Sequence, residues 1–248
     1  MQVKDFGRVA DIYDATRSIP EPEMIRLIEA MRGRVGGKGP LLDVGVGTGR
    51  FALPLQRAGV EVVGIDVSRG MMAKAREKGA EHLVYADVQR IPFRDRAFQT
   101  ALLVHILHLV GDWAAVVSES ARVASDEVMA VIEVAEGTSL RQEYRHLRAE
   151  MGLPLTLFER GERGLVERVK PSEITVVAEF EQSSSADEEV QHLRERGQSL
   201  TWDVPDEAHL EIIETLSSIY GGMTFRTRER IELAVWSSKE LREANLGA

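Results

Sequence analysis

The stretch Leu41-Leu42-Asp43-Val44-Gly45-Val46-Gly47-Thr48-Gly49-Arg50 decides the fold of this chain. An apolar segment runs into three alternating glycines and then into a helical pattern at residues 51–58, which predicts a strand, a tight turn and a helix. Glycines in such a turn permit positive φ and let a ligand lie against bare backbone. The start of the helix behind the turn is expected to offer unpaired N–H groups to an anionic group.

The spacing of the glycines indicates which ligand the turn binds. A dinucleotide-binding turn has the pattern G-x-G-x-x-G, but here the third glycine comes one residue early and Arg50 stands in its place. A P-loop is excluded because no Gly-Lys-Ser/Thr follows. The remaining pattern, D-x-G-x-G-T-G, resembles the S-adenosylmethionine (SAM) signature of class I methyltransferases. The alternative is a glycine-rich turn without a ligand. The resemblance implies that the turn contacts the amino-acid part of SAM through Gly45, Val46, Gly47, Thr48 and Gly49.

Composition limits the class of protein. The 248 residues are enough for one large α/β domain with a cap or for two small domains. The formal net charge of −9 disfavours nucleic acid as the main partner, although it does not exclude a local basic patch. The chain has no cysteine, so it has no disulfide, thiolate nucleophile or cysteine-based zinc site. No apolar run approaches the ~18–20 residues of a membrane span, and the N-terminus lacks the apolar region of a signal peptide. We therefore expect a cytoplasmic protein, with its oligomeric state left open.

A second buried strand is predicted at residues 60–66, a short β-branched run that ends in the carboxylate of Asp66. An acid at this point, about 20 residues past the glycines, typically holds a ribose hydroxyl. Asp66 therefore supports a nucleoside cofactor, SAM or NAD alike. The alternative is that Asp66 caps the next helix, for which Ser68 is also available. Val67 and Met71 are further candidates for cofactor contact, Met71 on the adenine side.

A third strand is predicted at residues 83–88, and Asp87 is its second-to-last residue. In the methyltransferase family an acid at this place accepts a hydrogen bond from the adenine amino group, so the resemblance implies cofactor contacts at Asp87 and Val88. The alternative is a turn-forming aspartate whose side chain bonds its own backbone two residues on.

His105 is the candidate catalytic base and a further candidate for cofactor contact. It follows a fourth strand predicted at residues 97–104 and continued through residues 105–109, at the edge where open α/β sheets place their ligand crevice. Imidazole titrates near neutrality, so it can accept a proton if the acceptor must lose one. His108 is the reserve candidate, and a purely structural histidine is the alternative. No carboxylate motif accompanies the two histidines, so no metal is expected.

Strands and helices alternate from Leu41 to Val134, with a helix at residues 113–123 and a fifth strand at residues 128–134, as in a doubly wound parallel sheet. This region resembles, motif by motif, the methyltransferase group that includes the ubiquinone/menaquinone biosynthesis enzymes. The motifs are residues 43–51, 64–68, 86–88 with 91–93, and Glu119 with 121–123. The resemblance implies an α/β, Rossmann-like sheet of seven strands, mostly parallel with an antiparallel last strand. Two departures are visible, Gln99 in place of the usual Asp and 125–127 in place of a Pro-Gly-Gly turn.

The whole chain is predicted to form a single methyltransferase domain, residues 1–248, with a helical N-terminal lid and helical cap insertions. Residues 1–36 form the lid, 37–136 the SAM-binding core, 137–172 and 181–228 the cap or substrate segments, and 173–180 and 229–237 the last two strands. In small-molecule methyltransferases the leading helix folds a Tyr-Asp pair over the cofactor, which implies that Tyr13 contacts SAM unless it only anchors its helix. Candidates for the acceptor pocket, most of them expected to be core, are Phe158, Trp202, Tyr220, Met223 and Phe225.

These patterns together predict a SAM-dependent methyltransferase that transfers the methyl group to a small-molecule acceptor and releases S-adenosylhomocysteine (SAH). The acceptor atom, O, N or C, is left open. A non-catalytic SAM- or SAH-binding module is the main alternative, because intact glycines and acids support binding without proving turnover. An NAD-dependent oxidoreductase is disfavoured by the glycine spacing, and an RNA methyltransferase by the net charge and by the lack of an appended RNA-binding module.

Overall fold

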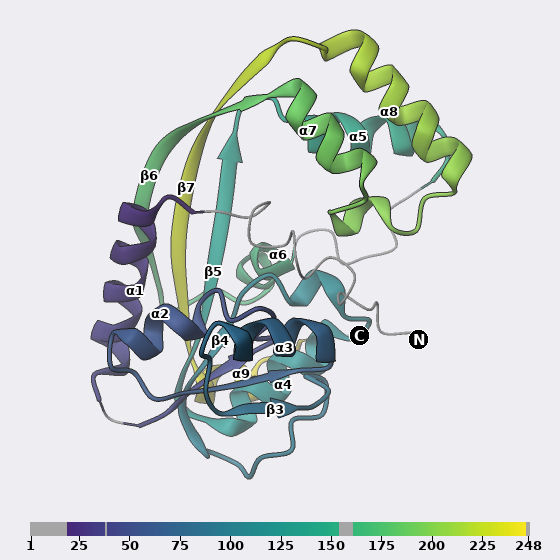
Figure 1. Cartoon of the computed structure of the whole chain (residues 1–248). Helices are drawn as coiled ribbons and strands as arrows, with labels where there is room; N and C mark the ends of the chain where they lie inside the picture. The colour runs from purple at the N-terminus through teal and green to yellow at the C-terminus, as the bar shows by residue number, and fades with distance from the viewer. Residues whose placement is uncertain (1–18, 38, 154–160, 247–248) are drawn as a thin grey trace. The chain divides into compact units, whose positions relative to one another are not determined.

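The computed structural model describes residues 19–37, 39–153 and 161–246 (Figure 1). The predicted lid residue Tyr13 and the acceptor candidate Phe158 lie outside these residues. The strands are β1 (Leu41–Val44), β2 (Val62–Asp66), β3 (Leu83–Tyr85), β4 (Phe98–Leu103), β5 (Ala124–Glu136), β6 (Glu173–Ser185) and β7 (Thr224–Ser237). The α-helices of the described residues are α1 (Glu21–Val35), α2 (Ala52–Arg57), α3 (Arg69–Glu77), α4 (Trp113–Val123), α5 (Leu140–Glu150), α6 (Gly161–Arg168), α7 (Ala186–Arg194), α8 (Asp206–Tyr220) and α9 (Ser238–Glu243). Short 3-10 helices lie at η3 (Leu107–Leu109) and η4 (Ser199–Thr201).

The strands form one sheet in the order β3-β2-β1-β4-β5-β7-β6. β1 pairs in parallel with both β2 and β4, and Leu41 stands opposite Val62 on one side and Thr100 on the other. The final strands are antiparallel, which confirms the predicted Rossmann-like sheet. The strand order reverses at β1, because the chain moves outward to β3 and then returns to β4. In open α/β sheets the ligand crevice lies at the carboxyl ends of the strands at this reversal.

The parallel strands are buried on both faces, which explains their continuous apolar sequences. Every residue of β1 and of β4 is buried, as expected where helices cover a parallel sheet on both sides. These two strands also bury three polar residues, Asp43, Gln99 and Thr100. Gln99, one of the two departures from the family pattern, has a buried Oε1 atom with no hydrogen-bond partner among the described residues.

The predicted continuation of the fourth strand is wrong. Residues 105–109 do not continue β4, because His105 turns the chain with φ 54° and a 3-10 helix, η3, follows. In the segment after α5, Gly161 and Gly164 lie inside the short helix α6. Both glycines are buried, and a Cβ added to Gly161 would stand 3.4 Å from Nδ1 of His108, so Gly161 allows close packing against that ring.

Several other strand ends differ from the prediction. β3 ends at Tyr85 instead of residue 88, and β5 begins at Ala124, so the residues that replace the family's Pro-Gly-Gly turn are strand. One of them, Glu127, stands opposite Thr100 and accepts a hydrogen bond from Arg34 at 3.2 Å. β6 and β7 extend beyond the predicted residues 173–180 and 229–237. Their extra residues are mostly polar and exposed, which is why hydrophobic periodicity missed them.

The chain divides into two compact units, and three of the four boundaries fall within β5, β6 and β7. The first unit comprises residues 1–132, 157–178 and 231–248 and holds the parallel strands. The second comprises residues 133–156 and 179–230 and holds α5, α7 and α8. The division into lid, core and cap remains a prediction.

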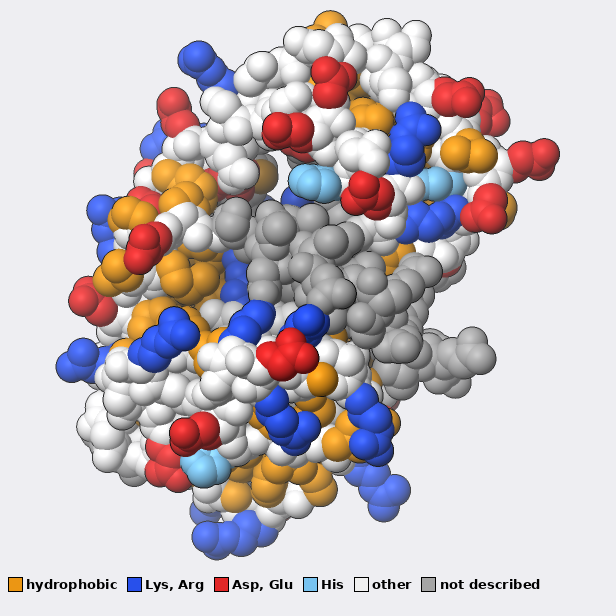
Figure 2. Space-filling model, in the orientation of Figure 1, with side chains coloured by type: hydrophobic (Ala, Val, Ile, Leu, Met, Phe, Trp, Pro, Cys, Tyr) orange, Lys and Arg blue, Asp and Glu red, His pale blue; other side chains and the backbone are white. Residues whose placement is uncertain are grey.

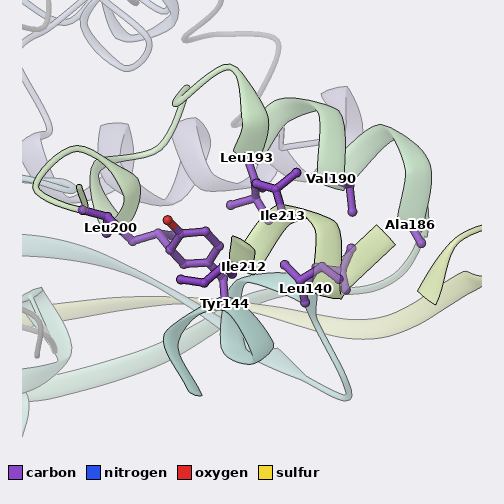
Figure 3. Packing of buried hydrophobic residues seen from close by; sticks show 10 residues of the cluster. Leu140, Tyr144, Ala186, Val190, Leu193, Leu200, Ile212 and Ile213 are labelled. Atoms are coloured by element: carbon purple, nitrogen blue, oxygen red, sulfur yellow. The ribbon is translucent and has the colours of Figure 1, made fainter. Parts of the chain in front are cut away.

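The second unit has its own apolar core. Figure 3 shows side chains of α5, α7 and α8 pointing toward one another, among them Leu140, Tyr144, Ile212 and Ile213. Of the predicted acceptor-pocket residues, Tyr220 and Phe225 pack against this core, whereas Met223 is exposed. Trp202 donates from Nε1 to the carbonyl of Arg196 at 2.7 Å.

The surface of the first unit carries basic side chains despite the negative total charge. Figure 2 shows Lys and Arg side chains over α2 and α3. Exposed basic residues of these helices and their ends are Arg57, Arg69, Arg76 and Lys78. Arg69 stacks on the exposed Tyr85 ring at 4.3 Å. Across the described part of the chain, no helix combines the length and apolar character needed to cross a membrane.

Candidate functional site

The glycine turn joins β1 to α2 in a left-handed backbone conformation. Gly45, Gly47 and Gly49 have φ values of 82°, 54° and 80°, which favour glycine. The backbone N–H groups of Gly45 and Val46 both donate to the carbonyl of Ile65 in β2 at 2.9 Å. The turn is therefore held against the carboxyl end of the neighbouring strand.

The three glycines are needed for different reasons. A Cβ on Gly45 would stand 2.7 Å from Cδ1 of Ile106, and a Cβ on Gly49 would stand 3.2 Å from Leu53, so packing inside the protein explains both. A Cβ on Gly47 would meet nothing closer than Cε of Met71 at 3.6 Å. Apart from its positive φ, nothing within the described residues demands glycine at position 47. Space beside the backbone of Gly47 is what a close-lying ligand requires.

Asp66 ties the glycine turn to the end of β2. Its Oδ2 accepts the N–H of Gly47 at 2.9 Å, and its Oδ1 accepts the N–H of Ser68 at 2.7 Å. Burial raises the pKa of the Asp66 carboxyl, and these backbone N–H groups oppose the rise. Ser68 is the N-cap of α3, where its hydroxyl accepts from Met71 N at 3.4 Å. Asp66 is thus not the cap of α3 and stands where a ribose partner is predicted, with Met71 beside Gly47.

Asp43 is a buried acid to which the sequence analysis assigned no role of its own. It lies in β1, and only 3% of its surface is exposed. Burial, and next the charge of Asp66, raise the pKa of the Asp43 carboxyl to about 7, while a hydrogen bond from the backbone N–H of Ala52 opposes this. Ala52 is the first residue of α2, so the chain's own carboxyl occupies that helix start. The expectation that α2 offers its N–H groups to an anionic ligand is therefore wrong for Ala52. The feature of the sequence that could have revealed this buried carboxyl is an acid within the apolar run of β1.

The buried Asp43 carboxyl predicts a pH dependence of stability. An ordinary Asp titrates near 3.8 and this one at about 7, so between these values the folded protein holds a proton that the unfolded chain releases. This group therefore makes folding less stable as the pH rises from about 4 to 7. We expect Asp43→Asn to flatten the fall of the thermal midpoint over this range, measured on the unliganded protein, while Glu61→Gln, at an exposed carboxyl, serves as the control. Equal slopes for wild type and Asp43→Asn would contradict the prediction.

Asp87 forms the local turn that was the alternative to adenine binding. Its Oδ1 accepts the N–H of Gln89 at 2.9 Å, two residues on, while the residue as a whole is exposed. The Gln89 side chain in turn accepts the N–H of Asp112 at 3.1 Å, and Asp112 is the N-cap of α4. The turn leaves Oδ2 of Asp87 without a hydrogen bond among the described residues. Adenine contact at Asp87 and at the buried Val88 remains a prediction.

A charged pair on α4 fixes the loop that follows Asp87. Glu119 accepts the N–H of Ile91 at 2.8 Å, and Arg122 donates to the carbonyls of Ile91 at 2.9 Å and Phe93 at 2.8 Å. The two side chains also pair with each other, and this pairing lowers the pKa of the Glu119 carboxyl. The side chains of Glu119 and Arg122 therefore fix the backbone of the loop after β3.

His105 lies at the same edge of the sheet as the glycine turn. Its φ of 54° is uncommon for a residue other than glycine, and such strain clusters at functional sites. The next residue, Ile106, is the one whose side chain lies against Gly45. The ring of His108 lies edge-on to that of His105, with centroids 6.2 Å apart. No group of three or more possible metal-ligating side chains occurs within the part of the chain that the structure describes.

The structure thus brings most of the predicted site together within the first unit. The glycine turn, Asp66, Met71 and the turn at His105 adjoin one another, and Lys78 donates to the carbonyl of Thr48 at 3.3 Å. Val67 is half-buried between Asp66 and the cap of α3. Tyr13 lies outside the described residues.

Comparison with known proteins links part of the chain to methyltransferases. Residues 42–132 match the methyltransferase domain family. A phosphatidylethanolamine N-methyltransferase of Cereibacter sphaeroides is 41% identical over 125 residues, 48% of this chain and 55% of that protein. A malonyl-[acyl-carrier protein] O-methyltransferase of Salmonella typhimurium is 30% identical over 144 residues, 56% of this chain and 57% of that protein. The chain spans about half the length of the curated relatives it matches.

Structural similarity extends further along the chain. The crystal structure of a protein from Bacillus halodurans, described as a methyltransferase, superimposes with a TM-score of 0.52 at 18% identity. The match covers 84% of this chain and 97% of that protein, which establishes the common fold. The comparisons thus link residues 42–132 to the methyltransferase domain family and give the chain the fold of the Bacillus halodurans protein.

Proposed function

We propose that the chain transfers a methyl group from SAM to a small-molecule acceptor and releases SAH. The observation that carries the proposal is the free space beside the backbone of Gly47, in a turn that the carboxyls of Asp43 and Asp66 border. SAM carries no pyrophosphate, so its binding does not need the N–H groups at the start of α2. A dinucleotide would bring its pyrophosphate to the start of α2, where the Asp43 carboxyl already accepts the Ala52 N–H.

Each candidate residue is proposed to contact a particular part of SAM. The backbone of residues 45–49 would hold the amino-acid part of SAM, and Asp66 would hold the ribose hydroxyls. Met71, Asp87 and Val88 would line the adenine side, with Val67 and Tyr13 as further contacts. The buried positions of Met71 and Val88 support an apolar environment for the adenine ring.

SAM supplies a methyl group on a positively charged sulfur, which an acceptor atom displaces directly. The chain's task is then to orient the acceptor and to keep water out. His105 is proposed to accept a proton where the acceptor must lose one. The relatives are named for N- and O-methylation, so the acceptor atom, O, N or C, stays open. A cytoplasmic location and the lack of a nucleic-acid partner remain predictions.

Thermal unfolding with SAM, SAH and NAD in parallel tests the cofactor. A ligand at about 100 times its dissociation constant stabilises the folded state by roughly 2.7 kcal/mol, which raises the midpoint of a chain of this size by about 5–10 °C. We expect this shift with SAM and SAH and none with NAD. A shift with NAD alone, or with none of the three, would contradict the proposal. If SAH binds but no acceptor supports SAH release from SAM, the non-catalytic binding module is the better description.

A further inference from the structure

A buried carboxylate from α6 lies beneath the turn that carries His105. Glu162 is the second residue of α6, and only 6% of its surface is exposed. Its Oε1 accepts the N–H of Ile106 at 2.8 Å and the N–H of Leu107 at 3.2 Å. One oxygen atom thus bonds two successive backbone donors between β4 and η3.

These two hydrogen bonds explain why the chain leaves the sheet at this point. The N–H groups of Ile106 and Leu107 would otherwise be unsatisfied, because a short helix leaves its first donors without partners. With both donors directed at Glu162, the chain cannot continue as a strand, and His105 takes the left-handed φ of 54°. The position of the predicted base therefore depends on a side chain 57 residues further on, since Ile106 and Glu162 are 56 residues apart.

The same turn supports the glycine loop. The side chain of Ile106 lies against Gly45, where an added Cβ would stand 2.7 Å from Cδ1 of Ile106. A second contact fixes α6 to the turn, because the ring of His108 lies against Gly161, the residue before Glu162. A displacement of the turn would therefore reach the first glycine of the cofactor loop as well as His105.

We propose that Glu162 is a positioning residue of the cofactor site, which acts by accepting the N–H groups of Ile106 and Leu107. It holds the turn so that Ile106 backs Gly45 and His105 stands at the end of β4. The role requires an acceptor oxygen and not a negative charge, so an amide at this position can perform it. The part of the inference that concerns cofactor affinity rests on the proposed function.

Three variants test this role. Glu162→Leu removes the acceptor and keeps a side chain of similar size, Glu162→Gln keeps an acceptor oxygen, and Glu167→Leu removes an exposed acid from the same helix as a control. We measure SAH affinity by calorimetry and the hydrogen exchange of the Ile106 and Leu107 amides by NMR. We expect Glu162→Leu to weaken SAH binding and to speed exchange at both amides by about tenfold or more, the equivalent of losing a hydrogen bond or two. Glu162→Gln should stay within about threefold of wild type in both readouts, and Glu167→Leu should match wild type.

Each outcome decides the inference. Wild-type affinity and wild-type exchange in Glu162→Leu would overturn it, and so would a Glu162→Gln variant as weak as Glu162→Leu, because charge would then be the requirement. If Glu162→Leu does not fold, Glu162→Asp, whose carboxyl is one methylene shorter, replaces it with the same expected direction. If wild type itself binds no SAH, the proposed function fails, whereas amide exchange still tests the role of Glu162.

Discussion

A Gly47→Val variant is expected to lose SAH binding by about 100-fold or more, because two effects add at one residue. The φ of 54° is disfavoured for a β-branched residue, at a cost of about 1–2 kcal/mol. The larger effect is steric, since the valine carbons would fill the space beside Met71 where the cofactor is proposed to approach the backbone. Calorimetry with SAH measures the loss.

The matched control is Gly59→Val. Gly59 also has a left-handed φ, 84°, but a Cβ there would meet nothing within 4 Å. Both variants should therefore lower the thermal midpoint of the unliganded protein by a similar amount, while only Gly47→Val loses SAH affinity. Normal SAH binding in Gly47→Val would contradict the proposed cofactor site as a whole.

An Asp203→Ala variant is expected to destabilise the second unit by about 3–5 kcal/mol. Arg148 of α5 has a side chain that is only 2% exposed, and it pairs with Asp203 through two hydrogen bonds of 2.9 Å. It also donates to the carbonyls of Leu153 at 2.8 Å and Leu200 at 2.6 Å. Removal of Asp203 leaves a buried guanidinium without its counter-charge, which costs more than the pair contributes. Urea unfolding, together with hydrogen exchange in α5, measures the effect.

Two controls separate the buried charge from ordinary loss of an ion pair. Glu150→Ala removes an exposed partner of His146 on the same helix and should change stability by less than about 1 kcal/mol. Combining Asp203→Ala with Arg148→Met removes both charges and should be more stable than Asp203→Ala alone. If Asp203→Ala is as stable as Glu150→Ala, the pair does not support the second unit.

The parts of the site that could be predicted from the sequence are those built from neighbouring residues. Positive φ at Gly45, Gly47 and Gly49 follows from residue type and spacing alone. The cap at Ser68 and the turn at Asp87 are likewise local, since each side chain bonds a backbone group two or three residues away. Buried parallel strands were visible as apolar runs, whereas the polar end of β6, residues 181–185, was not predicted as strand.

The sequence by itself determined the fold class, the glycine turn and the acids at the ends of the first strands, because short-range sterics and hydrophobic runs specify them. Only the tertiary structure decided which partners form hydrogen bonds with the remaining buried polar groups. Ile106 meets Glu162 across 56 residues, and Arg148 meets Asp203 across 55. Residues 105–109 were predicted to continue the strand, but the distant carboxylate of Glu162 accepts the N–H groups of Ile106 and Leu107. A buried donor must find an acceptor, and which acceptor it finds depends on how the whole chain packs.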